Sequence, residues 1–319
     1  MDKNRKTISI VAPCWNEGKN VIYCYDEVKK VFNNDLQNYD WELIFANDFS
    51  TDDTTKLLED LASKDPSHVK VINNARNYGV YRSTFNALKY ASGDAVVPML
   101  PVDLQDPPEE IPNLVKEWEN GYSVVYGMRY HRQEGFILKN IRRLYYVLLN
   151  RFSEIKIPKY AGEFQVIDRS VLNALKQYDD YYPFIRGMIA NVNSNSKGMH
   201  YTWKKREHGK SKHNYYKLYD QGINGLISFS NIPIRTIIFS GLIVSLFSFI
   251  FIFVQIFSHF FAKGHVAPPG ISTLIVGMFF FFGLLLVFLG VLGEYVAAIH
   301  AQVRKGPGVV EASKINLNQ

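Results

Sequence analysis

Charged residues are missing from two long stretches of this sequence. The chain has 319 residues, of which 36 are Lys or Arg and 30 are Asp or Glu, yet none of these types occurs in 236–262 or 271–293. Each stretch is longer than the roughly 20 apolar residues that a helix needs to cross a bilayer. The sequence therefore predicts two transmembrane helices, at about 233–258 and 271–296.

Other absences narrow the class of protein. The only two cysteines, Cys14 and Cys24, have no metal-ligand or disulfide spacing, so we expect ordinary thiols in a reducing compartment. Residues 1–6 are mostly polar and charged, which does not fit a signal peptide. No G-x-G-x-x-G follows the first predicted strand and no P-loop motif occurs, so dinucleotide and P-loop sites lose support.

Positive charge accompanies the apolar stretches. The net charge is +6, and no recognised nucleic-acid motif is present, so we assign this charge to an anionic membrane surface and expect no nucleic acid. Arg235 precedes the first predicted span, and Arg304 and Lys305 follow the second. The positive-inside rule then predicts a multi-pass protein with both termini in the cytoplasm. The expected parts are a cytoplasmic domain (1–214), a juxtamembrane amphipathic helix (215–231), the membrane helices (232–298) and a cytoplasmic tail (299–319).

A basic amphipathic segment lies inside the cytoplasmic domain. Residues 137–152 combine apolar side chains with Lys139, Arg142, Arg143 and Arg151. Such a segment is typical of a helix lying in the membrane interface. The alternative is a solvated helix packed on the domain.

The first part of the chain alternates strand and helix patterns. Strands are predicted at 7–13, 41–47, 68–73, 95–100 and 121–129, and the helices between them at 17–32, 51–62 and 81–91. This alternation predicts an α/β fold with a parallel, doubly wound sheet.

Polar residues follow three of these strands, and the carboxyl ends of parallel strands carry the ligand sites of such sheets. Trp15 offers an aromatic face for a nucleobase, and Glu17 and Asp48 offer carboxylates for base or ribose groups. Asp103 and Gln105 supply the oxygen ligands that Mg²⁺ or Mn²⁺ prefers when it also holds phosphates. The alternatives are helix caps for the acids near residue 52 and a proline-stopped turn near 103.

Nine short segments in order carry a resemblance. PCWNE, NDFSTDDT, NARNYG, DLQDPPE, YGMRY, GEFQVIDR, IRG, REHGKSK and ISFSNIPIR resemble the polyprenyl-phosphate glycosyltransferases of glycosyltransferase family 2, from about Ile8 to Arg304. The resemblance implies a GT-A fold, a nucleotide-sugar donor such as a UDP-sugar, and Mg²⁺ or Mn²⁺. It further implies inverting transfer to undecaprenyl phosphate at the cytoplasmic face of a bacterial cell membrane, by a homo-oligomer.

The resemblance also implies residue roles. The nucleotide-sugar residues would be Pro13, Trp15, Glu17, Asp48, Arg76, Asn77, Arg129 and Lys212. The metal residues would be Asp103 and Gln105, the catalytic residues Asp103, Glu163 and Arg206, and the acceptor-phosphate residues Arg129, Arg142 and Arg143. Glu163 stands where many relatives have Asp, and its alternative role is a structural partner for an arginine. An anionic acceptor phosphate needs no strong base, so positioning and charge stabilisation would be the main catalytic work.

Three further positions depart from the family pattern. Pro101 replaces the first acid of D-A-D-L-Q-D, Asn47 replaces a common Asp, and Phe49 replaces a common Gly. The loss at Pro101 leaves three explanations open, namely a weaker metal site, a different donor or lost activity. The alternative functions are a catalytically impaired lipid-binding scaffold and a processive polysaccharide synthase. The second has little support because Q-x-x-R-W is absent and two spans are few for a polymer channel.

Overall fold

An eight-stranded mixed sheet forms the centre of the computed structural model, which describes residues 5–129, 161–192, 195–204, 270–304 and 308–317 together with helical residues between 234 and 250. The strand order is β7-β5-β6-β4-β1-β2-β3-β8. The strands are β1 (Thr7–Cys14), β2 (Asp40–Asn47), β3 (Val69–Asn74), β4 (Ala95–Val97), β5 (Val124–Arg129), β6 (Ala161–Asp168), β7 (Ser196–Tyr201) and β8 (Glu311–Ile315).

The central strands β4, β1, β2 and β3 are parallel, as predicted. β6 runs antiparallel to both β4 and β5, which makes the sheet mixed. Cys14 pairs with Asn47, and Asn47 with Asn73, so β1, β2 and β3 end level with one another. The loops that follow β1 and β2 therefore begin side by side.

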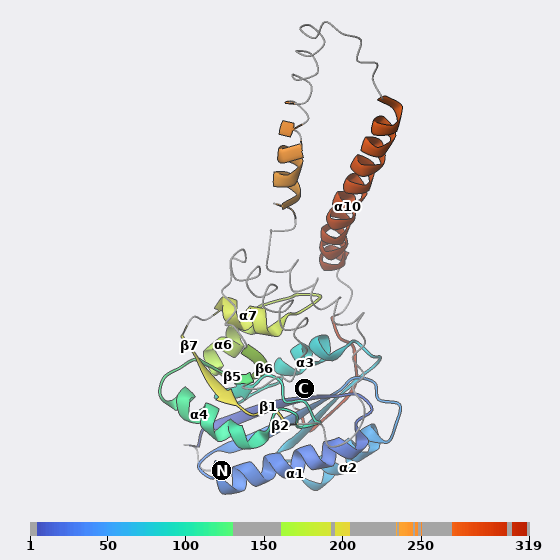
Figure 1. The fold of residues 1–319 in the computed structure, drawn as a ribbon. Helices are drawn as coiled ribbons and strands as arrows, with labels where there is room; N and C mark the ends of the chain where they lie inside the picture. Colours follow the sequence, from blue (N-terminus) through green and yellow to red (C-terminus); the bar gives the residue numbers. More distant parts are fainter. Residues whose placement is uncertain are drawn as a thin grey trace, which may run out of the picture.

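Helices cover both faces of the sheet (Figure 1). Alternate strand residues face opposite sides, so Ile10 and Leu43 join one buried core while Val11 and Ile44 join the other. The first core is closed by α1 (Gly18–Asn34), α2 (Thr54–Lys64) and α4 (Ile111–Glu119), and the second by α3 (Val80–Leu88), α6 (Arg169–Leu175) and α7 (Ile185–Val192).

Several element boundaries differ from the sequence-based expectation, and two of them have a clear local cause. β4 ends at Val97 rather than near residue 100, because the next residue is Pro98, which has no N–H for a ladder bond. α2 begins at Thr54, with Asp53 at its N-cap, rather than at Thr51, and the Asp52 carboxylate accepts a hydrogen bond from the Thr54 N–H at 3.0 Å in the turn that leads into the helix. Burial opposes ionisation of Asp52, but hydrogen bonds from Thr54 and neighbouring backbone lower its pKa overall.

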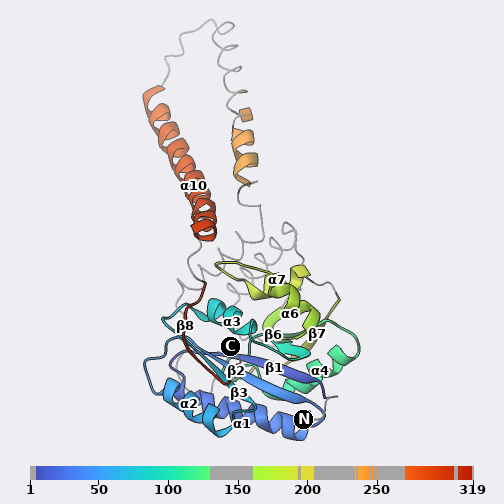
Figure 2. The ribbon, with the colours of Figure 1, turned by 180° about the vertical axis from the view of Figure 1, so that it is seen from behind.

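α10 (Gly270–Arg304) projects from the side of the domain that carries α3, α6 and α7 (Figure 1). Its portion Phe280–Arg304 is long and apolar enough to cross a membrane, and it is the one such helix among the described residues. Helical residues of 236–247 lie beside α10 in both views (Figures 1 and 2). The rest of the first predicted span, the segment 215–231 and the interface helix 137–152 lie outside the described residues.

The C-terminal residues take part in the fold. Residues 299–304 complete α10, and β8 then pairs antiparallel with β3 at the edge of the sheet (Figure 2). The region expected to be a cytoplasmic tail therefore includes a strand of the central sheet.

Candidate active site

Left-handed backbone marks three loops at the carboxyl ends of parallel strands. The φ angles are 53° at Asn16 after β1, 63° at Phe49 after β2 and 50° at Leu104 after β4. This conformation costs a non-glycine residue about 1–2 kcal/mol. Such strain gathers at ligand sites, where the surrounding structure holds it in place. The three loops therefore form the candidate site.

Two exposed aromatic side chains flank the loops after β1 and β2. Trp15 is 37 % exposed and Phe49 is 49 % exposed. Each presents a π-face on which a nucleobase can stack. Pro13 is buried inside β1 opposite Ala46, so its place is in the strand rather than at the loop surface. Phe49 was not among the predicted ligand residues; the available signal was an aromatic side chain where the family commonly has Gly.

The first two loops are locked together around Glu17. The Glu17 N–H donates to Thr54 Oγ1 at 2.9 Å, and Asn20 Nδ2 donates to the Glu17 carboxylate. Gly18 approaches Asp53 so closely that a Cβ would lie 2.1 Å from Asp53 Oδ1. A larger residue at position 18 would therefore have to displace the Asp53 side chain, while the Glu17 carboxylate is held by Asn20.

Asp48 is buried and holds the segment that follows β3. Its Oδ1 accepts hydrogen bonds from Asn74 Nδ2 at 2.9 Å and from the Tyr78 N–H at 2.8 Å. Its Oδ2 accepts from the Gly79 N–H at 2.8 Å. A carboxylate offers about four lone-pair positions. Asp48 therefore organises this segment with three of them and keeps capacity for one further donor.

Arg76 and Asn77 are exposed on the segment that Asp48 organises. The Arg76 guanidinium lies 4.4 Å from the centre of the Tyr78 ring, and Asn77 Oδ1 accepts from the Gly79 N–H at 3.2 Å. Gly79 has φ +87°, which lets both Tyr78 and Gly79 point their N–H groups at Asp48. The structure thus brings Arg76, Asn77 and Asp48 into one loop system.

Asn47 has a local reason for replacing the expected acid. Its Nδ2 donates to Asn73 Oδ1 at 2.8 Å and to Thr55 Oγ1 at 2.9 Å, and its Oδ1 accepts from Ser50 Oγ at 2.6 Å. An aspartate cannot donate either of the first two bonds. The amide therefore fits this buried position better than a carboxylate.

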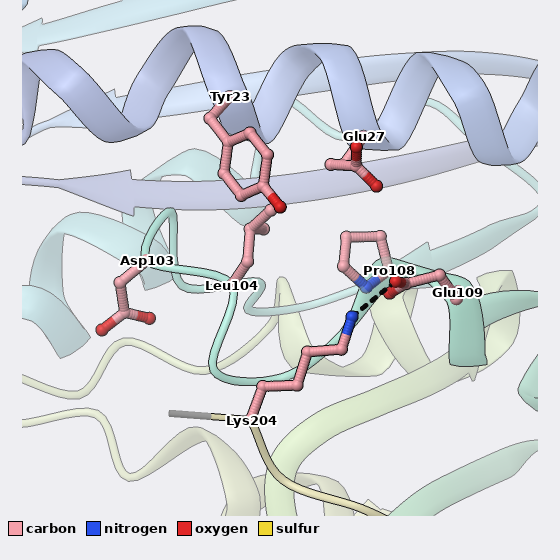
Figure 3. Close-up of a pocket in the computed structure, with 7 residues that line it drawn as sticks. All are labelled: Tyr23, Glu27, Asp103, Leu104, Pro108, Glu109 and Lys204. Carbon is pink, nitrogen blue, oxygen red and sulfur yellow. Dashed lines mark hydrogen bonds and ion pairs between the residues drawn. The ribbon is translucent and has the colours of Figure 1, made fainter. Parts of the chain in front are cut away.

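Asp103 lines a small hollow beside α1 (Figure 3). Tyr23 and Glu27 of α1 face this hollow, and Lys204 closes it by pairing with Glu109 at 2.6 Å. The Asp103 carboxylate points away from that pair and accepts from the Gln105 N–H at 3.3 Å. The Glu109 carboxylate is stabilised in turn, because Lys204 lowers its pKa against the opposing effect of burial.

The metal prediction rests on Asp103 and Gln105 alone. Among the described residues, no group of three His, Cys, Asp or Glu side chains is placed to hold a metal. Mg²⁺ typically uses one or two carboxylates and completes its shell with substrate phosphates and water. One carboxylate and one amide oxygen fit that kind of site, whose remaining ligands come from the substrate. Pro101 contributes only its carbonyl to the local turn, which accepts from the Leu104 N–H at 3.0 Å.

Arg129 is held by a buried acid that sequence reasoning did not single out. Asp106 is 1 % exposed and accepts from Arg129 Nη2 at 3.2 and 3.3 Å. The Tyr201 hydroxyl donates to Asp106 and accepts from Arg129 Nε at 3.1 Å. The guanidinium also stacks on the Trp203 ring at 5.1 Å. Asp106 therefore fixes Arg129, while Asp103 lies in a different setting three residues earlier.

Glu163 of β6 lies in the field of two arginines. Burial raises its pKa most, Asp106 adds to the rise, and Arg186 of α7 and Arg129 oppose it. A hydrogen bond with Tyr81 also favours the charged form. Arg186 was given no role from the sequence; the available signal was its place in the segment IRG, one of the nine that carry the resemblance. Both the catalytic and the structural interpretation of Glu163 are compatible with these neighbours.

Four predicted site residues lie outside the described residues: Arg142, Arg143, Arg206 and Lys212. Lys204 is the last described residue before Arg206, and its N–H donates to the Gln105 carbonyl at 3.0 Å. The two buried thiols, Cys14 and Cys24, are unpaired as disulfides, as expected. Burial and then the charge of Asp103 raise the pKa of Cys24.

The mixed sheet, with its aromatic and acidic loops at the strand ends, is the GT-A fold of a glycosyltransferase. The chain belongs to glycosyltransferase family 2, because residues 9–176 match the family model described as Glycosyl transferase family 2. The family and fold inferred from the nine segments are therefore confirmed.

Relatives match along almost the whole chain. An uncharacterized glycosyltransferase of Bacillus subtilis, YkcC, is 33 % identical over 94 % of this chain and 91 % of its own length. The SfII prophage-derived bactoprenol glucosyl transferase of Shigella flexneri is 33 % identical over 94 % of this chain and 96 % of its own. Among solved structures, the mannosyltransferase PcManGT of Pyrobaculum calidifontis, in complex with GDP-Man and Mn²⁺, is 16 % identical, with a TM-score of 0.49 over 95 % of this chain and 77 % of that one.

Proposed function

We propose that this glycosyltransferase moves a monosaccharide from a UDP-sugar to undecaprenyl phosphate, with inversion, at the cytoplasmic face of a bacterial membrane. The observation that carries the proposal is that exposed aromatic side chains and buried carboxylates meet on neighbouring strand ends of a domain joined to α10. The bactoprenol glucosyl transferases support the acceptor class, since they match over 94 % of the chain, more than the catalytic domain alone.

The donor would bind across the loops after β1, β2 and β3. Trp15 and Phe49 would stack on the base, and Glu17 and the remaining lone pair of Asp48 would accept from base or ribose groups. Arg76 and Asn77 are exposed on the adjacent segment and would reach polar groups of the nucleotide. Pro13 would support this cradle from inside β1.

Asp103 and Gln105 would hold Mg²⁺ or Mn²⁺ together with the diphosphate. When bound there, the cation would neutralise charge that develops on the leaving diphosphate. Arg206 and Lys212 follow Lys204 in the chain and would add positive charge to the same group. A single carboxylate at this loop suits a cation that arrives with its nucleotide rather than before it.

The acceptor phosphate would approach from the opposite side of the sugar. Arg129, Arg142 and Arg143 would bind its oxygens, because a guanidinium can bond two oxygens at once. One phosphate oxygen would form the new bond to the anomeric carbon while the bond to the diphosphate breaks, which inverts that centre. Glu163, which feels the charges of Arg129 and Arg186, would orient Arg129 toward the acceptor phosphate.

In this proposal the protein crosses the membrane more than once, has both termini in the cytoplasm and forms a homo-oligomer.

A transfer assay tests this proposal directly. The purified full chain is incubated with undecaprenyl phosphate, Mg²⁺ or Mn²⁺ and a panel of labelled UDP- and GDP-sugars. We expect one lipid-linked monosaccharide that fails to form with Asp103→Asn. The matched control is Glu117→Gln, which also changes a carboxylate to an amide. Glu117 lies on α4 and forms an ion pair with Lys197 of β7. No product with any donor would favour the impaired scaffold, and a product with several sugars would favour a processive synthase.

A further inference from the structure

The C-terminal segment, residues 308–316, crosses the loop that Asp48 organises. This loop, residues 74–79, is called the donor loop below. The Ala75 N–H donates to the Val310 carbonyl at 2.9 Å, and the Val310 N–H donates to the Tyr78 hydroxyl at 3.2 Å. Arg82 donates to the Gly308 carbonyl. The donor loop is thus held from one side by Asp48 and from the other by the C-terminal segment.

The same segment fixes the elements on either side of the donor loop. Glu311 accepts from Asn86 Nδ2 at 2.6 Å and from the Tyr90 hydroxyl at 2.8 Å, and both donors belong to α3 and the turn after it. Ser313 Oγ accepts from Asn73 Nδ2 at 2.9 Å, which leaves Asn73 Oδ1 facing the Asn47 amide. The C-terminal segment therefore contacts three consecutive elements: β3, the donor loop and α3.

Further contacts connect the donor loop with the end of α10. Gln302, near the end of α10, accepts from the Tyr181 N–H at 2.9 Å and donates to the Asp179 carbonyl at 2.8 Å. The Arg82 guanidinium lies 4.2 Å from the centre of the Tyr181 ring and 5.0 Å from that of Tyr78. A continuous set of contacts thus joins α10 to the donor loop.

We propose that the C-terminal segment positions the donor loop for nucleotide binding, and that Tyr78 is the positioning residue that links the two. The inference rests on the proposed function in one respect, that the donor binds beside Asp48. The Tyr78 and Gly79 N–H groups reach Asp48 only while the loop keeps its left-handed turn at Gly79. The hydrogen bond from the Val310 N–H to the Tyr78 hydroxyl favours that conformation in the unliganded protein. The nucleotide therefore binds with a smaller entropy cost for ordering the donor loop.

Tyr78→Phe tests the link with a single missing oxygen. The ring remains between Arg76 and Arg82, and only the acceptor for the Val310 N–H is lost. Because one hydrogen bond contributes about 0.5–1.5 kcal/mol, we expect UDP affinity in the presence of Mg²⁺ to fall about two- to tenfold. The donor KM should rise by a similar factor while kcat stays near the wild-type value. Glu311→Ala, which releases α3 from the segment, should act in the same direction.

Asn316→Gly is the matched control at the far end of β8. Asn316 Nδ2 donates to the Ala62 and Val69 carbonyls at 2.9 Å each, and its φ of 58° suits glycine. This variant loosens the C-terminal segment without touching the donor loop, so UDP affinity should stay within twofold of wild type. Equal weakening in Asn316→Gly and Tyr78→Phe would mean that the segment acts only through general stability, and would overturn the inference.

Amide hydrogen exchange tests the positioning of the donor loop independently of the transferase proposal, because it requires no nucleotide. In the unliganded full chain, amides of residues 75–79 should exchange faster in Tyr78→Phe than in wild type, and at the wild-type rate in Asn316→Gly. Unchanged exchange and unchanged UDP affinity in Tyr78→Phe would overturn the positioning role while leaving the transferase proposal intact. If the variants differ in exchange as expected but the wild-type protein binds neither UDP nor GDP, the proposed donor is contradicted. The positioning of the donor loop by the C-terminal segment would still stand.

Discussion

Replacing Asp106 with Asn should lower the thermal stability of this protein far more than replacing Asp103 with Asn, although the two acids lie on one loop. Asp106 is 1 % exposed and accepts from Arg129 and Tyr201. An amide at this position removes the compensating charge and turns an NH₂ group toward either the guanidinium or the hydroxyl. Asp103 accepts a bond from the Gln105 N–H at 3.3 Å, which an asparagine oxygen can keep.

The magnitudes follow from the burial of each pair. Breaking a buried ion pair by removing one partner costs about 3–5 kcal/mol. The Arg129 side chain is 21 % exposed and keeps some water, so we expect the lower end, about 3 kcal/mol. Each kcal/mol shifts Tm by about 2–4 °C in a protein domain of this size, which gives a decrease of about 6–12 °C for Asp106→Asn. For Asp103→Asn we expect a smaller shift, within about 2 °C, since the asparagine oxygen can keep the bond from the Gln105 N–H.

The functional effects should run in the opposite order. Asp103→Asn removes the carboxylate proposed for the metal, so Mg²⁺-dependent UDP binding should weaken at least about tenfold. The assay is intrinsic-fluorescence melting of the full chain in one detergent, followed by UDP titration with and without Mg²⁺. Tyr201→Phe serves as an intermediate, with an expected cost of about 1–3 kcal/mol for the groups it leaves unbonded. Equal melting temperatures for the two Asn variants would refute the separate environments on which the reasoning depends.

Three further outcomes are expected. Glu42→Gln should destabilise the protein by about 1–3 kcal/mol at pH 7, because buried Glu42 accepts from Ser9, Lys70 and Ser92. Burial opposes its ionisation, yet these donors lower its pKa, so the Tm difference from wild type should shrink as the pH falls through that lowered value; a constant difference would contradict this. Phe49→Gly should leave Tm unchanged or raise it, since it removes about 1–2 kcal/mol of left-handed strain, while UDP binding weakens; a clear loss of Tm would show that the ring packs for stability. Pro101→Asp should tighten Mg²⁺ binding without nucleotide, whereas an unchanged titration would show that position 101 does not face the metal.

Local pattern predicted the central sheet because its strands are apolar runs separated by helical periods. The parallel order of β4, β1, β2 and β3 and the polar strand ends follow from that alternation. β8 was not predictable in the same way. Its sequence, EASKI, is short and charged, as edge strands tend to be, and its stability comes from pairing with β3 rather than from its own pattern.

The two departures at Asn47 and Phe49 show where sequence reasoning about a site stops. A family pattern marks both as unusual but cannot give the cause, because the causes are a distant partner and a backbone angle. Asn47 donates to Asn73, 26 residues away, and Asn73 is fixed by Ser313, 240 residues further along the chain. Phe49 keeps the left-handed backbone that glycine would adopt freely, and the same angle exposes its ring.

The acidic residues at these strand ends differ in the hydrogen bonds that they accept from the protein. Asp48 receives three hydrogen bonds from the donor loop, and Asp106 receives Arg129 and Tyr201. Since a carboxylate engaged on this scale is held in one orientation, each of these acids fixes a neighbouring group, and Asp48 keeps one lone-pair position for the proposed nucleotide. Asp103 accepts a 3.3 Å bond within its own turn, next to the left-handed backbone of Leu104. It lines the hollow beside α1, and in our proposal it is the acid that binds the diphosphate-bound cation.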